Sequence, residues 1–132
     1  GQAPSEVHSS RDILAVYDDE ESVRSLSPDQ ARLMALDEGL GVCVTAKGDT
    51  VDFVSRFFAP KAGVAEDPVT GSAHCTLVPV WAERLGRSRL VAHQVSARGG
   101  ELHCELRGDR VIMSGHCVLF LTGSINLHSP GS

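Results

Sequence analysis

The stretch FFAPKAGVAEDPVTGSAHCTLVPVWAERLG, residues 57–86, decides the fold of this 132-residue chain. Strand-like aromatic residues lead into a loop rich in proline and glycine over 59–70, and an apolar segment over 71–85 follows. Because the apolar residues of 71–85 run almost all round a helix, we expect this helix to be central and buried and to end at Gly86. Pro79 within it predicts a kink or a broken first turn.

The junction between loop and helix predicts a ligand site. Gly71 lets the backbone approach a ligand closely, and Thr70 or Ser72 can cap the helix. The first N–H groups of a helix have no intrahelical acceptors, so they can bind a carboxylate or enolate oxygen, and Asp67 can orient an amino or hydroxyl group. The same residue types also serve as plain turn and cap residues, so a purely structural interpretation stays open. The candidate site residues are Asp67, Thr70, Gly71, Ser72, Ala73 and His74.

The segments around this junction predict an α+β domain of short strands about one buried helix. Residues 1–11 are expected to be a flexible lead-in, 12–127 a single lobe and 128–132 a tail. Short helices are predicted from Asp18 and from Ser27, the latter capped by Ser27 and stopped by Gly39. The expected strands are 12–17, 40–46 and 51–58 (a hairpin), 90–97, 101–106, and 111 to about 126 with a break near 115–116.

Composition limits the possible functions. A net charge of −5 argues against nucleic acid as a partner, since phosphate neutralisation needs a basic face. No apolar run is long enough to span a membrane and the N-terminus carries no signal-peptide pattern, so we expect a cytoplasmic protein. The four cysteines lie far apart in apolar or strand-like segments, which indicates reduced core thiols.

Three His–Cys pairs, at 74–75, 103–104 and 116–117, invite a zinc interpretation. Neighbouring residues of a strand point to opposite faces, so an adjacent pair does not readily chelate one ion, and no C-x2-C or H-x3-H spacing occurs. We therefore expect no metal site. Cys75 is expected in the core rather than in catalysis, Trp81 on the sheet-facing side of the helix, and Phe58 near the site loop.

The run over 57–86 resembles the signature of PhzF-like (phenazine biosynthesis-like) proteins, whose second, C-terminal domain carries a Glu-Asp-Pro-Val-Thr-Gly-Ser-Ala element. Gln94 and the segment 96–100 resemble the family's Gln-x-Ser-x-Arg-Gly-Gly, and 40–46 and 111–126 resemble its neighbouring strands. The likeness covers roughly residues 12–127. It implies one lobe of the diaminopimelate-epimerase-like fold, a curled, mostly antiparallel sheet around a central buried helix.

The resemblance also implies an activity: cofactor-free proton transfer on a small amino-acid-like or hydroxy-acid-like substrate, in a cleft between two lobes. Asp67 matches the family's cleft aspartate that contacts the substrate, and Gly71 and Ser72 match the helix-end residues that hold its acidic group. The family's proton-transfer glutamate lies in the first lobe, in an Asn-Leu-Ser-Glu-Thr-like segment that these 132 residues do not contain. Glu66 and His74 flank the motif as other possible bases, although a packed histidine is the favoured interpretation of His74.

Three hypotheses follow. The chain is a lobe of a PhzF-like isomerase that contributes the half of the cleft binding the acidic group. Alternatively, it is a stand-alone ligand-binding or interaction domain without catalysis. In a third variant, two copies pair as a homodimer and rebuild a two-lobed cleft, because a surface that normally faces another lobe would be apolar and would not remain bare.

Overall fold

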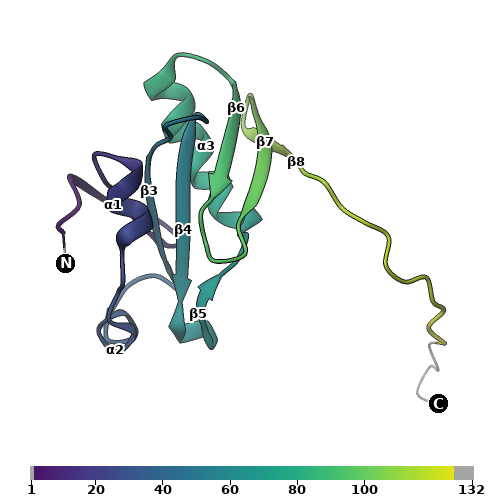
Figure 1. The fold of residues 1–132 in the computed structure, drawn as a ribbon, viewed down its shortest axis with the longest axis horizontal. Helices are drawn as coiled ribbons and strands as arrows, with labels where there is room; N and C mark the ends of the chain where they lie inside the picture. The colour runs from purple at the N-terminus through teal and green to yellow at the C-terminus, as the bar shows by residue number, and fades with distance from the viewer. Residues whose placement is uncertain (1, 127–132) are drawn as a thin grey trace.

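The computed structural model describes residues 2–126, which form one sheet with helices on both of its faces (Figure 1). The strands are β1 (Glu6–Ser9), β2 (Ile13–Val16), β3 (Val42–Lys47), β4 (Phe53–Ala59), β5 (Val64–Asp67), β6 (Arg89–Gln94), β7 (Gly100–Arg107) and β8 (Arg110–Ser114). The helices are α1 (Glu20–Ser25), α2 (Gln30–Met34), α3 (Gly71–Leu85) and a short 3-10 turn, η1 (Pro60–Ala62).

The eight strands form a mostly antiparallel sheet, as predicted. Their order is β1-β2-β3-β4-β6-β7-β8, and β5 pairs with β4 off this path. Only the pairs β2–β3 and β4–β6 are parallel. The connection between each parallel pair contains helices: α1 and α2 lie between β2 and β3, and α3 lies between β4 and β6. The expected hairpin is confirmed as β3–β4, which pairs Val42 with Phe58 and Lys47 with Phe53.

The central strands are buried on both faces, so their sequences are apolar runs rather than clean alternations. Successive residues point to opposite faces. Phe53 and Phe57 therefore pack on the side of α3, whereas Val54 and Phe58 pack on the side of α1 with Val23. Figure 1 shows α3 lying behind β4 and β6, with α1 against β3.

The predicted central helix is confirmed at both ends as α3, which begins at Gly71 and ends before Gly86, a left-handed cap with φ 65°. The helix runs continuously through Pro79, so its first turn is not broken. It buries one face rather than its whole circumference, and Glu83 is among the exposed residues of the other. Trp81 faces the sheet as expected: its ring stacks on Phe53, with centroids 5.7 Å apart.

Two predictions near the N-terminus are wrong. The expected flexible lead-in contains β1, which pairs antiparallel with β2 from Glu6↔Val16 to Ser9↔Ile13. The second helix is capped by Asp29, not by Ser27, because the Asp29 carboxylate accepts the first free N–H groups at 3.0 and 3.2 Å. An ionised carboxylate also suits the positive helix end better than a serine hydroxyl does.

Two further segments differ from prediction. The loop 59–70 holds η1 and β5, so backbone pairing with β4 fixes the approach to the site. The last strand ends at Ser114 instead of continuing to about 126, and residues 115–126 carry no secondary structure and extend away from the sheet (Figure 1). Their large apolar side chains are exposed: Val118, Leu119, Phe120, Leu121 and Ile125. The expected tail at 128–132 lies outside the described residues.

The cysteine prediction holds in part. All four thiols are free, and Cys43 and Cys104 are buried as core residues. Cys75 and Cys117 are exposed, so the prediction of core thiols is wrong for these two. Cys75 lies on the solvent side of α3, because the buried Ala73 and Leu77 are each two positions away and therefore lie on the opposite side of the helix. Within residues 2–126, no helix has the length and apolar character needed to cross a membrane.

Candidate functional site

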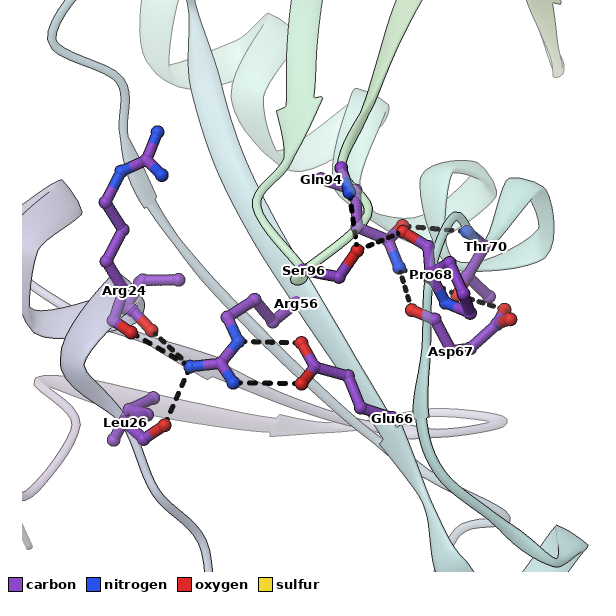
Figure 2. Close-up of polar contacts among 11 residues, drawn as sticks. Arg24, Leu26, Arg56, Glu66, Asp67, Pro68, Thr70, Gln94 and Ser96 are labelled. Carbon is purple, nitrogen blue, oxygen red and sulfur yellow. Dashed lines mark hydrogen bonds and ion pairs between the residues drawn. The ribbon is translucent and has the colours of Figure 1, made fainter.

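The loop before α3 is held by a buried glutamine on β6. Gln94 is 1% exposed. Its Oε1 accepts the Thr70 N–H at 2.7 Å, and its Nε2 donates to the Asp67 carbonyl oxygen at 2.7 Å and to Thr70 Oγ1 at 3.1 Å (Figure 2). The amide thus satisfies backbone groups on both sides of Pro68-Val69. This contact explains why Gln94 accompanies the motif although 24 residues separate it from Thr70.

The segment after β6 fastens the same loop from another side. Ser96 Oγ donates to the Pro68 carbonyl oxygen at 2.8 Å and accepts the Gly99 N–H at 3.0 Å. Gly100 lies directly against Val69, since a Cβ atom built on Gly100 would be 2.3 Å from Val69 Cγ2. The 96–100 segment therefore positions the site loop through a hydroxyl bridge and a close backbone approach.

Arg56 on β4 joins the site strand to α1 (Figure 2). Its Nε and Nη2 donate to the two carboxylate oxygens of Glu66 at 2.8 and 3.0 Å, and its Nη1 donates to three carbonyl oxygens at the C-terminal end of α1, those of Val23, Arg24 and Leu26. A guanidinium at a helix C-terminus also interacts favourably with the helix dipole. Glu66 is thus engaged in a two-point ion pair and is not placed as a proton-transfer base.

The N-terminus of α3 has no side-chain cap, contrary to the prediction that Thr70 or Ser72 would cap it. Thr70 occupies the cap position, but its hydroxyl donates to Asp67 Oδ2 at 2.5 Å instead. Gly71 and Ser72 are exposed, and a Cβ atom built on Gly71 would meet no atom within 4 Å. The first turn of α3 therefore opens onto space beside a carboxylate, while the Ala73 side chain is buried beneath it.

A positively charged side chain that was not predicted, Arg11, lies near this helix end. Arg11 Nη2 lies 3.3 Å from Ser72 Oγ, and its Nε lies 3.3 Å from Asp12 Oδ2. The side chain is 64% exposed, so it can move toward a ligand. Sequence patterns could not indicate this neighbour, since 61 residues separate Arg11 from Ser72 and the segment was expected to be flexible.

The side chain of His74, in the first turn of α3, points into the core beneath the open helix end. The residue is fully buried, its Nδ1 lies 2.8 Å from the Thr70 carbonyl oxygen, and its ring is tilted against Phe53. Burial lowers the pKa of His74, and the bond to Thr70 opposes that shift only in part. Burial thus favours the neutral imidazole, and His74 is packed in the core as expected. Phe58 is likewise buried, on the α1 side of the sheet, and does not lie beside the site.

The structure thus brings Asp67, Thr70, Gly71 and Ser72 together at one helix end, with Ala73 and His74 beneath. An open hollow of 430 Å³ adjoins the loop that fastens them. It is lined by Arg24, His93, Gln94, Val95, Ser96, Arg98, Gly99, Gly100 and Glu101. Within the described chain the carboxylate of Asp67 is only half-buried, so the site faces outward and is not enclosed.

Comparisons with known proteins agree with this architecture. The family profile described as "Phenazine biosynthesis-like protein" matches residues 1–123. A Pseudomonas aeruginosa protein named as an uncharacterized isomerase is 55% identical over 128 residues, covering 96% of this chain and 49% of that protein. A PhzF-family crystal structure from Enterococcus faecalis is 52% identical with a TM-score of 0.86, over 87% of this chain and 44% of that one.

A second crystal structure, of a putative phenazine biosynthesis PhzC/PhzF protein from Clostridium difficile, is 46% identical with a TM-score of 0.87, over 96% of this chain and 49% of that one. The chain spans about half the length of the curated relatives it matches most fully. The fold and the resemblance carried by residues 57–86 are thereby confirmed, and the chain belongs to the PhzC–PhzF family of phenazine biosynthesis-like proteins.

Proposed function

We propose that this chain binds the acidic group of a small amino-acid-like or hydroxy-acid-like substrate and contributes one half of a cofactor-free isomerase cleft. The observation that carries the proposal is the N-terminus of α3, which lacks a side-chain cap and opens onto space at Gly71. Backbone N–H groups at such an end attract carboxylate and enolate oxygens. Two relatives from Pseudomonas aeruginosa are named as uncharacterized isomerases, which is consistent with this chemistry.

The site residues have distinct roles in this proposal. The N–H groups of Gly71, Ser72 and Ala73 hold the acidic group, with the Ser72 hydroxyl beside them. Asp67, anchored by Thr70, receives the amino or hydroxyl group of the substrate. Arg11 supplies a positive charge that strengthens anion binding.

His74 supports the helix end from below through its bond to the Thr70 carbonyl oxygen. Proton removal from the carbon next to the acidic group, and its return, then requires a base from a second lobe or, in a homodimer, the carboxylate of Asp67 in the second copy.

Two observations support such a partner. The chain spans about half the length of its curated relatives. The segment after β8 exposes consecutive apolar side chains, with Phe120 97% and Leu119 83% exposed. A run of this kind is a typical contact surface for another protein domain. The competing proposal, a ligand-binding domain without catalysis, needs the helix end but not the partner.

Replacing Gly71 by alanine tests the site without disturbing the fold. Its φ is not positive and the added methyl group has space, so we expect the folded state to gain roughly 0.4–1 kcal/mol from reduced flexibility of the unfolded chain. The same methyl group would occupy the ligand position, so calorimetric binding of small amino and hydroxy acids should weaken at least tenfold. Ser72→Trp should abolish binding, and Ser88→Trp, beyond the other end of α3, should not alter it.

Arg11→Gln should weaken carboxylate binding and reduce its dependence on salt, since one cation is removed from the site. Unchanged ligand affinity in Gly71→Ala and Ser72→Trp together would remove the helix end from consideration.

The partner is tested by light scattering on a sizing column. We expect the chain to be a dimer and Phe120→Asp to be a monomer. The dimer alone should exchange the substrate's α-proton for deuterium in heavy water. Ligand binding by a monomer that shows no exchange would favour the non-catalytic domain.

A further inference from the structure

Three exposed side chains of types that can bind metals lie close together at the start of β7. Glu101, His103 and His116 each offer one ligand atom, and these atoms all lie within 4.8 Å of one another. We propose that Glu101, His103 and His116 form a binding site for one divalent transition-metal ion of the zinc class. The site lies apart from the N-terminus of α3 and is independent of the proposed isomerase chemistry.

Strand register explains why these residues meet. Glu101 and His103 are two residues apart on β7, so their side chains point to the same face. β7 pairs with β8 so that His103 faces Ser114. Continued two residues back along β7 and two residues forward past the end of β8, this antiparallel register would place Glu101 opposite His116. The backbone keeps that approach beyond the end of β8, since a Cβ atom built on Gly115 would lie 3.6 Å from the Glu101 carbonyl oxygen.

The distances are close to those that a metal needs. His103 Nε2 lies 3.0 Å from Glu101 Oε1, and the rings of His103 and His116 meet edge to face with centroids 6.5 Å apart. Two ligand atoms bound to one tetrahedral zinc ion at about 2.0–2.2 Å lie roughly 3.3 Å apart. All three residues are exposed, so small rotations of their side chains can bring the atoms from 4.8 Å to that spacing. Water would complete the coordination.

A fourth residue orients the carboxylate. His93 on β6 pairs directly with Glu101 in the β6–β7 register, and its Nε2 lies 2.9 Å from Glu101 Oε2. One carboxylate oxygen is therefore held by His93 while the other points to His103. Hydrogen bonds of this outer kind fix ligand geometry and strengthen metal binding.

The donor set selects the metal. Imidazole nitrogen is preferred by zinc, copper and nickel, whereas magnesium and calcium prefer oxygen ligands. Two imidazoles with one carboxylate therefore favour Zn²⁺ over Mg²⁺.

The chain provides its own control in the pair His8–Glu6. Its Nε2 to Oε2 distance is 3.0 Å and its side chains are 53% and 46% exposed, nearly the same as the 51% and 45% of His103 and Glu101. This pair belongs to no cluster of three such ligands among the described residues. If a surface His–Glu pair alone bound zinc, both pairs would do so.

The experiment measures Zn²⁺ binding by calorimetry, with protein free of any histidine tag and treated with a chelator beforehand. Cys75→Ser/Cys117→Ser is the background, because both thiols are exposed and Cys117 adjoins His116. We expect one Zn²⁺ per chain, no competition by Mg²⁺, and at least a tenfold loss of affinity in His103→Ala and in His116→Ala. The Zn²⁺ affinity of His93→Ala should be roughly 10–100-fold weaker, which is the usual effect of removing a hydrogen-bond partner of a metal ligand.

His8→Ala should bind Zn²⁺ like the background protein. Bound Co²⁺ should show a visible spectrum of nitrogen and oxygen ligands without a thiolate charge-transfer band. The proposal would be overturned if the background protein did not bind Zn²⁺, or if His103→Ala and His116→Ala bound Zn²⁺ as tightly as the background protein does. It would also be overturned if His8→Ala lost as much affinity as those two variants. The residues are exposed, so a circular dichroism spectrum like that of the background protein confirms folding of every variant.

Discussion

Replacing Gln94 by leucine tests whether one buried amide holds the site loop. The two side chains are similar in size, so the substitution removes hydrogen bonds while leaving little space. Gln94 satisfies the Thr70 N–H and the Asp67 carbonyl oxygen, both at 2.7 Å. A buried backbone group that loses its partner costs about 1–3 kcal/mol, so the two together should cost about 2–6 kcal/mol.

That loss is large against the roughly 5–15 kcal/mol that holds a typical domain folded. Urea unfolding followed by circular dichroism measures it, with Gln2→Leu as the control at an exposed glutamine. We expect Gln94→Leu to shift the midpoint strongly and to abolish carboxylate binding, while Gln2→Leu changes neither. A destabilisation under about 1 kcal/mol would show that the loop does not depend on this amide.

Gln94→Glu separates the donor from the acceptor. A carboxylate still accepts the Thr70 N–H, but only the protonated acid can donate to the Asp67 carbonyl oxygen. Burial raises the pKa of such a carboxyl group above its ordinary value of about 4.3. The penalty of this variant should therefore be smallest below that pH and should grow as the pH rises through the raised pKa. An equal difference from wild type at pH 4 and pH 8 would contradict this explanation.

Three further predictions follow from burial and packing. At pH 8 a thiol reagent should label the two exposed cysteines of the folded chain and all four after unfolding, because burial raises the pKa of Cys104 to about 11 and shields both core thiols. The free energy of unfolding should fall as the pH drops below about 6.5, because His74 then binds a proton in the unfolded chain but not in the folded one, where burial lowers its pKa. In urea titrations, His74→Phe should lose this part of the dependence of the unfolding free energy on pH. Gly100→Ala should lower stability by about 1–3 kcal/mol in thermal melts, because its methyl group overlaps Val69, and an unchanged melting temperature would argue against that close contact.

Local chemistry made much of the fold predictable. The helix from Gly71 to Gly86 follows from its apolar run and its glycine stop, and the β3–β4 hairpin follows from two apolar runs around a polar turn. The errors in the strand predictions have a common cause: tertiary pairing supplies hydrogen bonds that local sequence does not display. Strand β1 forms because its backbone pairs with β2, and β5 forms because its backbone pairs with β4. The predicted strand does not form beyond Ser114, because past the residues beside the start of β7 the segment has no neighbouring strand in the described chain.

The candidate site residues could be named from the sequence, but one neighbour of that site and a separate cluster of side chains could not. Arg11 reaches Ser72 through the fold alone. The proposed metal site was not expected, because the prediction considered adjacent His–Cys pairs. Its residues instead lie on alternate positions of β7 and on the segment after β8, at Glu101, His103 and His116. Such sets become visible in sequence only when strand pairing is known.

The use of the Thr70 hydroxyl links stability to function at the helix end. A threonine at the cap position normally bonds the first turn of its helix, and losing that cap costs about 0.5–2 kcal/mol. Here the hydroxyl turns to Asp67, and Gln94 donates to the same oxygen. The first N–H groups of α3 thereby remain without a side-chain cap, while the Asp67 carboxylate is held in place. A ligand's acidic group would restore the missing cap, so we expect binding to raise the melting temperature of the chain even before any partner lobe is present.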